Sequence, residues 1–188
     1  MTTETTMSLR ERQAPLKARY QEDPGSAKLV MSAHSVTTSG DPTRCTIAVP
    51  NGGGELAISW EAGAHPMAGG DGEVACSGDL LLASLAACQE ITLRMVATAM
   101  GVELRNVDLR VEGDLDFRGT MGVDPETPVG FESIRTIISL DADESPERLE
   151  KLVARAERYC VVGATLRDGT ALTTSIDARS TTGAVSHD

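Results

Sequence analysis

The sequence predicts an α+β fold with antiparallel sheets. Three strand-like segments follow one another between Lys28 and Trp60, separated only by short turns. A long apolar helix comes next, and two further strands, a second helix and a last strand complete the order. Strands joined by short turns pair in the antiparallel sense. Strands and helices that are segregated along the chain are typical of α+β proteins, whereas a wound parallel sheet needs them to alternate.

The first three strands are expected to form an antiparallel meander. Apolar and polar residues alternate in the second of them, which is the pattern of a half-buried strand. The Asn-Gly-Gly-Gly sequence at residues 51–54 is a strong turn signal between the second strand and the third. The expected strands are Lys28–Val36, Arg44–Val49 and Glu55–Trp60.

The longest apolar stretch, Cys76–Gly101, predicts a central helix. Ser77 or Asp79 can cap its start, and Gly101 ends it. A helix that is apolar on nearly all sides is buried in a core or in an interface. Three charged side chains interrupt the stretch, which argues against a membrane span. One stripe of this helix, with spacings of three and four residues, comprises Leu81, Leu85, Cys88, Thr92, Met95 and Ala99.

The second half of the chain is expected to add strands and one more helix. That helix begins at Ser145-Pro146, because Pro is favoured in a first helical turn. Its apolar face places Cys160 at its C-terminal end, toward the core. The expected strands of this half are Arg105–Phe117, Phe131–Leu140 and, at the end, Ala171–Ile176.

We expect three regions along the chain. Residues 1–27 form an N-terminal arm, in which Leu9–Gln21 is either a surface helix with solvated charges or a segment that packs on a partner subunit. Residues 28–178 form one folded domain, and residues 179–188 form a disordered tail.

Composition and charge exclude several classes of function. The net charge of −11 argues against nucleic acid and against anionic membranes as partners. Aromatic residues make up only 3%, so no platform for stacking bases is evident. There is no CxxC sequence, and the histidines and cysteines lack ligand spacing, so no metal is expected. Four widely spaced cysteines and the lack of an apolar leader at Met1–Leu9 indicate a cytoplasmic protein with reduced thiols.

Two cysteine segments and a glycine-rich loop resemble a known family. They are LLLASLAACQEITLR around Cys88, AERYC ending at Cys160, and GGDG at residues 69–72. Together they are similar to the two cysteine motifs of the OsmC/Ohr superfamily, and the order of strands and helices fits over residues 28–178.

The resemblance implies a fold and an activity. The family fold is an intertwined homodimer, in which antiparallel sheets from both subunits wrap around two long central helices. Family enzymes reduce organic hydroperoxides and, less well, hydrogen peroxide, without a cofactor or metal. By resemblance Cys88 is the peroxidatic thiolate and Cys160 the resolving thiol. An external dithiol, a lipoylated protein in some members, reduces the resulting disulfide.

The resemblance also implies that an Arg and a carboxylate assist Cys88, and here the match is loose. The family carboxylate lies nine or ten residues before the first cysteine, where this chain has Asp79 and Gly78. On a straight helix Asp79 lies about 13 Å along the axis from Cys88, and it is also a good helix cap. Arg44 is the expected cation, because it lies near the turn between the first two strands.

Other interpretations remain open. Arg94 is a second candidate cation, although a pair with Glu90 four residues earlier explains it equally well. Val161 follows Cys160 where the family often has Pro. Both cysteines can also be inert buried thiols. The alternative function is a dimer of this fold that binds a small hydrophobic ligand without efficient peroxidase turnover.

The remaining candidates are assigned structural roles. We expect Cys45 and Cys76 to be packing thiols and His65 to form a structural hydrogen bond.

Overall fold

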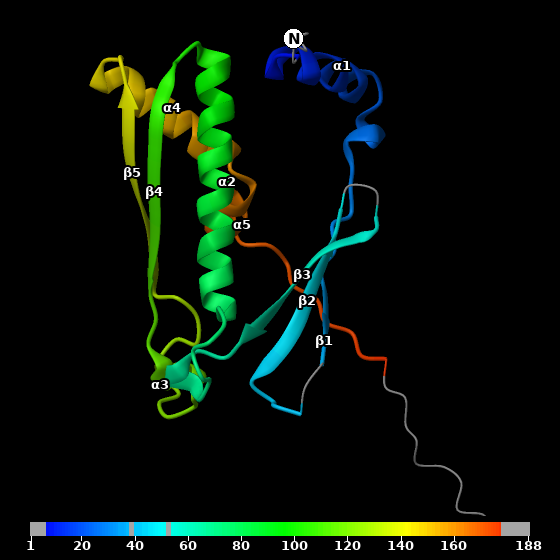
Figure 1. Cartoon of the computed structure of the whole chain (residues 1–188), viewed down its shortest axis with the longest axis vertical. Helices are drawn as coiled ribbons and strands as arrows, with labels where there is room; N and C mark the ends of the chain where they lie inside the picture. The colour runs from blue at the N-terminus through cyan, green and yellow to red at the C-terminus, as the bar shows by residue number, and fades with distance from the viewer. Residues whose placement is uncertain (1–6, 38–39, 52–53, 178–188) are drawn as a thin grey trace, which may run out of the picture.

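The structure is a computed structural model that describes residues 7–37, 40–51 and 54–177. It confirms the α+β class, with two antiparallel sheets and a long central helix (Figure 1). The expectations for residues 1–6 and for the tail 179–188 lie outside the described residues. The strands are β1 (His34–Val36), β2 (Arg44–Pro50), β3 (Leu56–Gly63), β4 (Leu104–Asp114) and β5 (Ser133–Ala142). The helices are α1 (Leu9–Glu22), α2 (Ser77–Met100), α3 (Phe117–Thr120), α4 (Pro146–Tyr159) and α5 (Val161–Asp168).

The first sheet is the expected meander in the order β1-β2-β3. All its strands are antiparallel, and Ile47 of β2 lies opposite both Ser35 of β1 and Trp60 of β3. The second sheet pairs β4 with β5, with Leu109 opposite Ile138. The two sheets are separate, and in Figure 1 they stand on either side of α2.

The core lies where α2 packs against α4 and β4. Its buried side chains pair the inner face of α2 with the apolar face of α4, and Leu93 and Leu152 are almost completely enclosed. Burying an aliphatic side chain of this size stabilises the fold by about 1.5–3 kcal/mol. The buried cluster comprises Leu93, Ala97, Val102, Leu152 and Ala156.

Helix α2 begins and ends close to the predicted residues. Its N-cap is Cys76, and the Asp79 carboxylate accepts the Cys76 backbone N–H at 2.9 Å, as in a capping box. Gly101 ends it with a φ of 66°, a left-handed conformation that suits glycine. Helix α2 is long and apolar enough to cross a membrane, but core helices of folded domains are often equally long and apolar. Here α4, α5 and β4 pack on it.

The chain nevertheless exposes far more surface than a compact monomer. Its accessible surface is 14,643 Å², whereas a folded monomer of 19.8 kDa exposes about 8,600 Å². If the residues outside the described ranges contribute the full surface of an extended chain, about 3,200 Å², an excess of roughly 3,000 Å² remains. Part of it lies on α2, where Ile91 is 55% exposed. This chain alone therefore leaves large surfaces uncovered.

Two strand predictions were wrong. The first strand spans only His34–Val36, because β1 pairs with only three residues of β2, and the preceding segment 28–33 is exposed. Residues 171–176 form no strand and are exposed, since no other described segment pairs with them. Neither segment pairs with a strand among the described residues, and each carries apolar side chains. Leu29, Val30, Met31, Leu172 and Ile176 are each more than 80% exposed.

Two helices were not predicted. Helix α3 interrupts the expected loop before β5. Helix α5 follows Cys160 directly, before the segment that was expected to form the last strand. Helix α5 determines the geometry of the site, as described next.

Candidate active site

The two cysteines of the motifs meet in the structure. Cys88 lies in the middle of α2, and Cys160 lies at the junction between α4 and α5. Their side chains are within hydrogen-bonding contact, and both are free thiols. Cys160 is 1% exposed, whereas Cys88 is only partly buried and can be reached from solvent. The fold therefore brings together two thiols that are 72 residues apart in the sequence.

Antiparallel packing of α4 on α2 produces this contact. At one end, Arg148 near the start of α4 donates a hydrogen bond to the Met100 carbonyl at the end of α2, at 3.0 Å. Between the two ends, Leu152 and Ala156 pack against the inner face of α2. The other end of α4 consequently lies beside the middle of α2, where Cys88 is.

A sharp change of direction at Cys160 then places the start of α5 over the sulfur pair. Cys160 ends α4 and is also the N-cap of α5. The Gly163 N–H donates to Cys160 Sγ at 3.3 Å, and the Val161 and Val162 N–H groups lie close enough to the Cys88 sulfur to lower its pKa. Free N–H groups at a helix N-terminus carry partial positive charge. They favour a thiolate at this position.

The pKa values of the two thiols are shifted in opposite directions. Burial raises the pKa of the Cys88 thiol, but hydrogen bonds from the Val162 N–H, the Cys160 thiol, the Val161 N–H and the Thr92 hydroxyl outweigh it, so the pKa falls below its ordinary value. Burial also raises the pKa of Cys160; the Gly163 N–H opposes this rise, whereas the contact with Cys88 adds to it. The pKa of Cys160 is therefore above its ordinary value. Cys88 is the better thiolate and Cys160 holds the proton.

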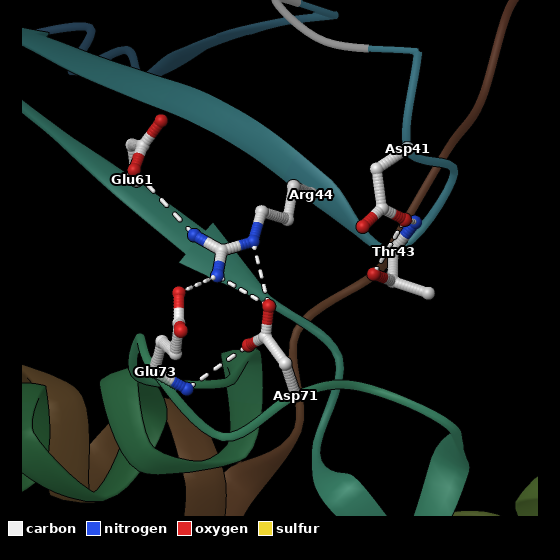
Figure 2. Close-up of polar contacts among 6 residues, drawn as sticks. All are labelled: Asp41, Thr43, Arg44, Glu61, Asp71 and Glu73. Atoms are coloured by element: carbon white, nitrogen blue, oxygen red, sulfur yellow. Dashed lines mark hydrogen bonds and ion pairs between the residues drawn. The ribbon is translucent and has the colours of Figure 1, made fainter.

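Arg44 lies elsewhere, in a cluster of carboxylates (Figure 2). Its guanidinium donates to Asp71 and, at 2.6 Å, to Glu73, and it lies 3.6 Å from Glu61. Asp71 belongs to the glycine-rich loop, so Arg44 holds this loop against the hairpin of β2 and β3. Within the described chain the structure does not bring Arg44 to Cys88.

Asp79 is also away from the sulfur pair. As the third residue of α2 it caps the helix through the Cys76 N–H. It lies nine residues before Cys88 on one continuous helix, about 13 Å along the axis. A Cβ on Gly78 would lie 3.4 Å from the Phe131 ring, at the short end of ordinary van der Waals contact.

The other candidates have structural roles. Arg94 pairs with Glu90 at 3.2 Å along the exposed side of α2. The His65 Nδ1 accepts the Met67 N–H at 3.1 Å, and its ring stacks on Phe117 at 4.9 Å. Among the residues that the structure describes, no group of three or more His, Cys, Asp or Glu side chains is placed to hold a metal ion.

Sequence reasoning missed Thr92 as a partner of Cys88, and it missed α5. The spacing of four residues from Cys88 was the available signal for Thr92. For α5 the signals were Cys160 as a cap and Gly169 as a helix end.

Comparison with models of protein families gives one match for this chain. The family model described as OsmC-like protein matches residues 70–175, which include both cysteines and α5. The chain belongs to the OsmC-like family. A search of curated proteins found no match.

Solved structures of this family have the same fold. An OsmC-like protein from Mycoplasma pneumoniae is similar with a TM-score of 0.61 and 16% identity, over 76% of this chain and 90% of that one. An organic hydroperoxide resistance protein OsmC from Legionella pneumophila has a TM-score of 0.54 and 21% identity, over 74% and 90%. An organic hydroperoxide resistance protein from Elizabethkingia anophelis has a TM-score of 0.53 and 14% identity, over 76% and 91%. At these identities the likeness extends to the fold.

Proposed function

We propose that this protein is a thiol peroxidase that reduces organic hydroperoxides in defence against oxidative stress. The observation that carries the proposal is the pairing of a thiolate-prone Cys88 with a protonated Cys160 within contact distance. Membership of the OsmC-like family supports it. So does the likeness to two proteins named for organic hydroperoxide resistance.

The chemistry proceeds in two steps at the sulfur pair. The Cys88 thiolate attacks the outer oxygen of the hydroperoxide, the O–O bond breaks, and the alkoxide leaves as the alcohol after taking a proton. Cys88 is then a sulfenic acid. The Cys160 sulfur attacks the Cys88 sulfur, a disulfide forms, and the hydroxyl leaves as water with the thiol proton. An external dithiol then reduces the disulfide by exchange and is itself oxidised to a disulfide.

Local geometry suits both steps. The first step needs a thiolate near neutral pH, which the N–H groups of Val161 and Val162 favour. The second needs a neighbouring thiol that does not compete for the substrate, and Cys160 is almost completely buried. A close resolving thiol limits further oxidation of Cys88 to sulfinic acid.

The proposal includes a homodimer. The excess exposed surface and the exposed apolar side chains of segments 28–33 and 171–176 support it, because a second copy would cover them. In such a dimer the Arg44 and Asp79 of one subunit could reach the Cys88 of the other.

One observation favours the alternative function, binding of a small hydrophobic ligand. A groove of about 630 Å³ on the Cys160 side of α2 is floored by apolar residues. Grooves of this volume accommodate small organic ligands. Its apolar lining residues include Leu81, Leu85, Phe131, Ile134 and Leu166.

Measuring the turnover of a hydroperoxide distinguishes the peroxidase function from the ligand-binding function. Purified protein should consume cumene hydroperoxide with dithiothreitol or dihydrolipoamide as reductant, and Cys88→Ser should abolish consumption. Cys160→Ser should leave the first oxidation intact but stall turnover and drive Cys88 to sulfinic acid. Cys45→Ser and Cys76→Ser serve as controls and should change little. If peptide mapping after one equivalent of hydroperoxide finds no disulfide between Cys88 and Cys160, the peroxidase proposal fails and the binding function takes precedence.

A further inference from the structure

Helix α5 depends on its first turn for stability. It spans only Val161–Asp168, about two turns of helix, and none of its residues is buried. Isolated helices of this length are marginal in water, because the first turn fixes several residues for one hydrogen bond. Helix α4, which precedes α5, is instead anchored in the core by Leu152 and Ala156. The groups that support the start of α5 should therefore decide whether it stays folded.

The two sulfurs of the redox pair supply this support. Cys160 is the N-cap of α5, and its sulfur accepts the Gly163 N–H at 3.3 Å. The Val161 and Val162 N–H groups lie close to the sulfur of Cys88, which is the thiol with the lowered pKa. An N-cap acceptor and a negative charge near the N-terminus both stabilise a helix. The reduced pair, with Cys88 as a thiolate, thus supports the first turn of α5 in two ways.

Disulfide formation weakens both kinds of support. The two sulfurs must close from hydrogen-bonding contact to bonding distance, so the Cys160 sulfur has to leave its present position beside the Gly163 N–H. The Cys88 sulfur also loses its negative charge when it becomes part of a disulfide. The N–H groups of the first turn then lack acceptors of comparable strength, and a helix end without acceptors frays. Oxidation should therefore loosen the helix that lies over the sulfur pair.

We propose that α5 is a redox-sensitive lid, which the disulfide between Cys88 and Cys160 loosens so that an external dithiol can reach the disulfide. The inference rests on the disulfide chemistry of the proposed function. It accounts for the burial of Cys160, which is 1% exposed with both thiols free, although a reductant must later reach the oxidised pair. The dithiol gives two electrons and two protons to the pair and becomes a disulfide itself. The two freed thiols then support α5 again, and the lid closes.

Hydrogen exchange measures the state of the lid directly. Diamide takes two electrons and two protons from the two thiols, so it forms the disulfide without a hydroperoxide, and peptide mapping verifies that Cys88 is joined to Cys160. The amides of residues 164–169, which bond within α5, should then exchange at least tenfold faster than in the reduced protein. The amides of residues 150–156 in α4 should not change. Equal exchange of residues 164–169 in the two forms would overturn the proposal, and so would failure of diamide to join the two cysteines.

Two substitutions of Cys160 separate loss of the cap from formation of the disulfide. Ser is a good N-cap and Ala is a poor one, and neither can form a disulfide. Cys160→Ser should keep the slow exchange that α5 shows in the reduced wild type. Cys160→Ala should show, under reducing conditions, much of the faster exchange that the wild type shows only after oxidation. If α5 is equally protected in the two variants, Cys160 does not support the helix and the proposal is wrong.

The stability of the lid should also set the rate at which the disulfide is reduced. Thr165 is an exposed residue of α5, and its hydroxyl bonds the Val161 carbonyl at 2.9 Å. Thr165→Gly and Thr165→Ala remove the same hydroxyl, but Gly weakens a helix and Ala strengthens it. Dihydrolipoamide should reduce the diamide-formed disulfide about fivefold faster in the Gly variant than in the Ala variant. The first oxidation of Cys88 should be equal in the two variants within about twofold, and equal rates of reduction would contradict the lid.

Failure of the lid can be told apart from failure of the peroxidase function, because the exchange and reduction experiments need no turnover of hydroperoxide. A protein whose α5 loosens on oxidation but which consumes no hydroperoxide would retain the lid and reject the peroxidase. A peroxidase whose α5 exchanges equally in both redox forms would retain the proposed function and reject the lid.

Discussion

The backbone N–H of Gly163 donates to the Cys160 sulfur at 3.3 Å, so that the first turn of α5 begins directly at the redox pair. The Gly163 N–H only partly offsets the rise that burial and the contact with Cys88 give to the pKa of Cys160. The N–H of residue 163 serves Cys160, and those of residues 161 and 162 reach Cys88. The start of one short helix therefore orients both sulfurs.

The first prediction concerns the acidity of Cys88. Val161→Pro should raise the pKa of Cys88, because Pro removes one N–H donor to its sulfur. The substitution should fold, since Cys160 has φ −74° and ψ 109°, which suits a residue before Pro, and Pro is favoured at the first position of a helix. Rates of alkylation against pH measure the pKa, and alkylation at neutral pH should slow several-fold.

Two variants complete this experiment. Val161→Ala keeps the N–H and should leave the pKa of Cys88 unchanged. Arg44→Gln should also leave it unchanged if the N–H groups of α5 suffice. A rise in the pKa with Arg44→Gln, and none with Val161→Pro, would show that the Arg44 of a second subunit stabilises the thiolate.

The second prediction concerns Gly163. A Cβ at this position would lie 3.3 Å from the Cys160 sulfur and 3.7 Å from Leu85. Gly163→Val should therefore push Cys160 away from Cys88 and destabilise the protein by about 1–3 kcal/mol. Stopped-flow measurement should find the first oxidation of Cys88 nearly unchanged and disulfide formation at least tenfold slower. Equal rates of disulfide formation in both proteins would contradict this account.

The third prediction concerns Asp79 as a helix cap. The hydrogen bond from the Cys76 N–H holds the pKa of Asp79 below its ordinary value. A lowered pKa in the folded state gives a contribution to stability that is present above the unfolded pKa of about 3.9 and is lost as pH falls through the folded pKa. Asp79→Asn should thus cost most at neutral pH, about 1 kcal/mol by urea unfolding, and little at the lowest pH.

Activity distinguishes this cap from a catalytic carboxylate. Asp79→Asn should leave the pKa of Cys88 and the rate of its first oxidation unchanged. A large loss of peroxidase activity in a fully folded variant would instead show that Asp79 acts on a sulfur pair, which would have to belong to a second subunit.

The sequence was sufficient to predict the helices that have a clear apolar periodicity or a clear capping signal. The stripe containing Leu85 and Cys88 predicts α2, and Ser145-Pro146 predicts the start of α4. Helix α5 is short, and its apolar residues show no long periodicity, so only its caps could indicate it. Residues 28–33 of the predicted first strand and the predicted strand 171–176 need a partner strand, and the described part of the chain supplies none.

The site was harder to predict than the fold. The cysteines were found from their motifs. In contrast, two of the four groups that lower the pKa of Cys88 are backbone N–H groups, which every residue except Pro carries and which therefore leave no mark in a sequence. Arg44 and Asp79 were inferred by position, and their partners in the folded chain are the carboxylates of residues 61, 71 and 73 and the Cys76 N–H.

The last prediction is that the protein is an obligate homodimer with α2 at its centre. The exposed side chain of Ile91 lies one helical turn from Cys88, on the side of α2 that this chain leaves uncovered. Small residues beside it would allow the α2 of a second subunit to approach closely. Roughly 3,000 Å² of uncovered surface per chain is about 6,000 Å² for two chains, which is enough for an obligate interface; these bury about 2,000–5,000 Å² or more in total. Light scattering should give twice the chain mass of 19.8 kDa at micromolar concentration.

A pair of substitutions tests which surface forms the dimer. Ile91→Glu places a charge on the open face of α2 and should weaken the dimer and lower its melting temperature in a concentration-dependent way, because folding and association are linked. Val123→Glu adds the same charge at a residue that is 73% exposed on the loop after α3, and should do neither. A stable, folded wild-type monomer at micromolar concentration would contradict the dimer. The uncovered surface would then have to be a docking site for another partner.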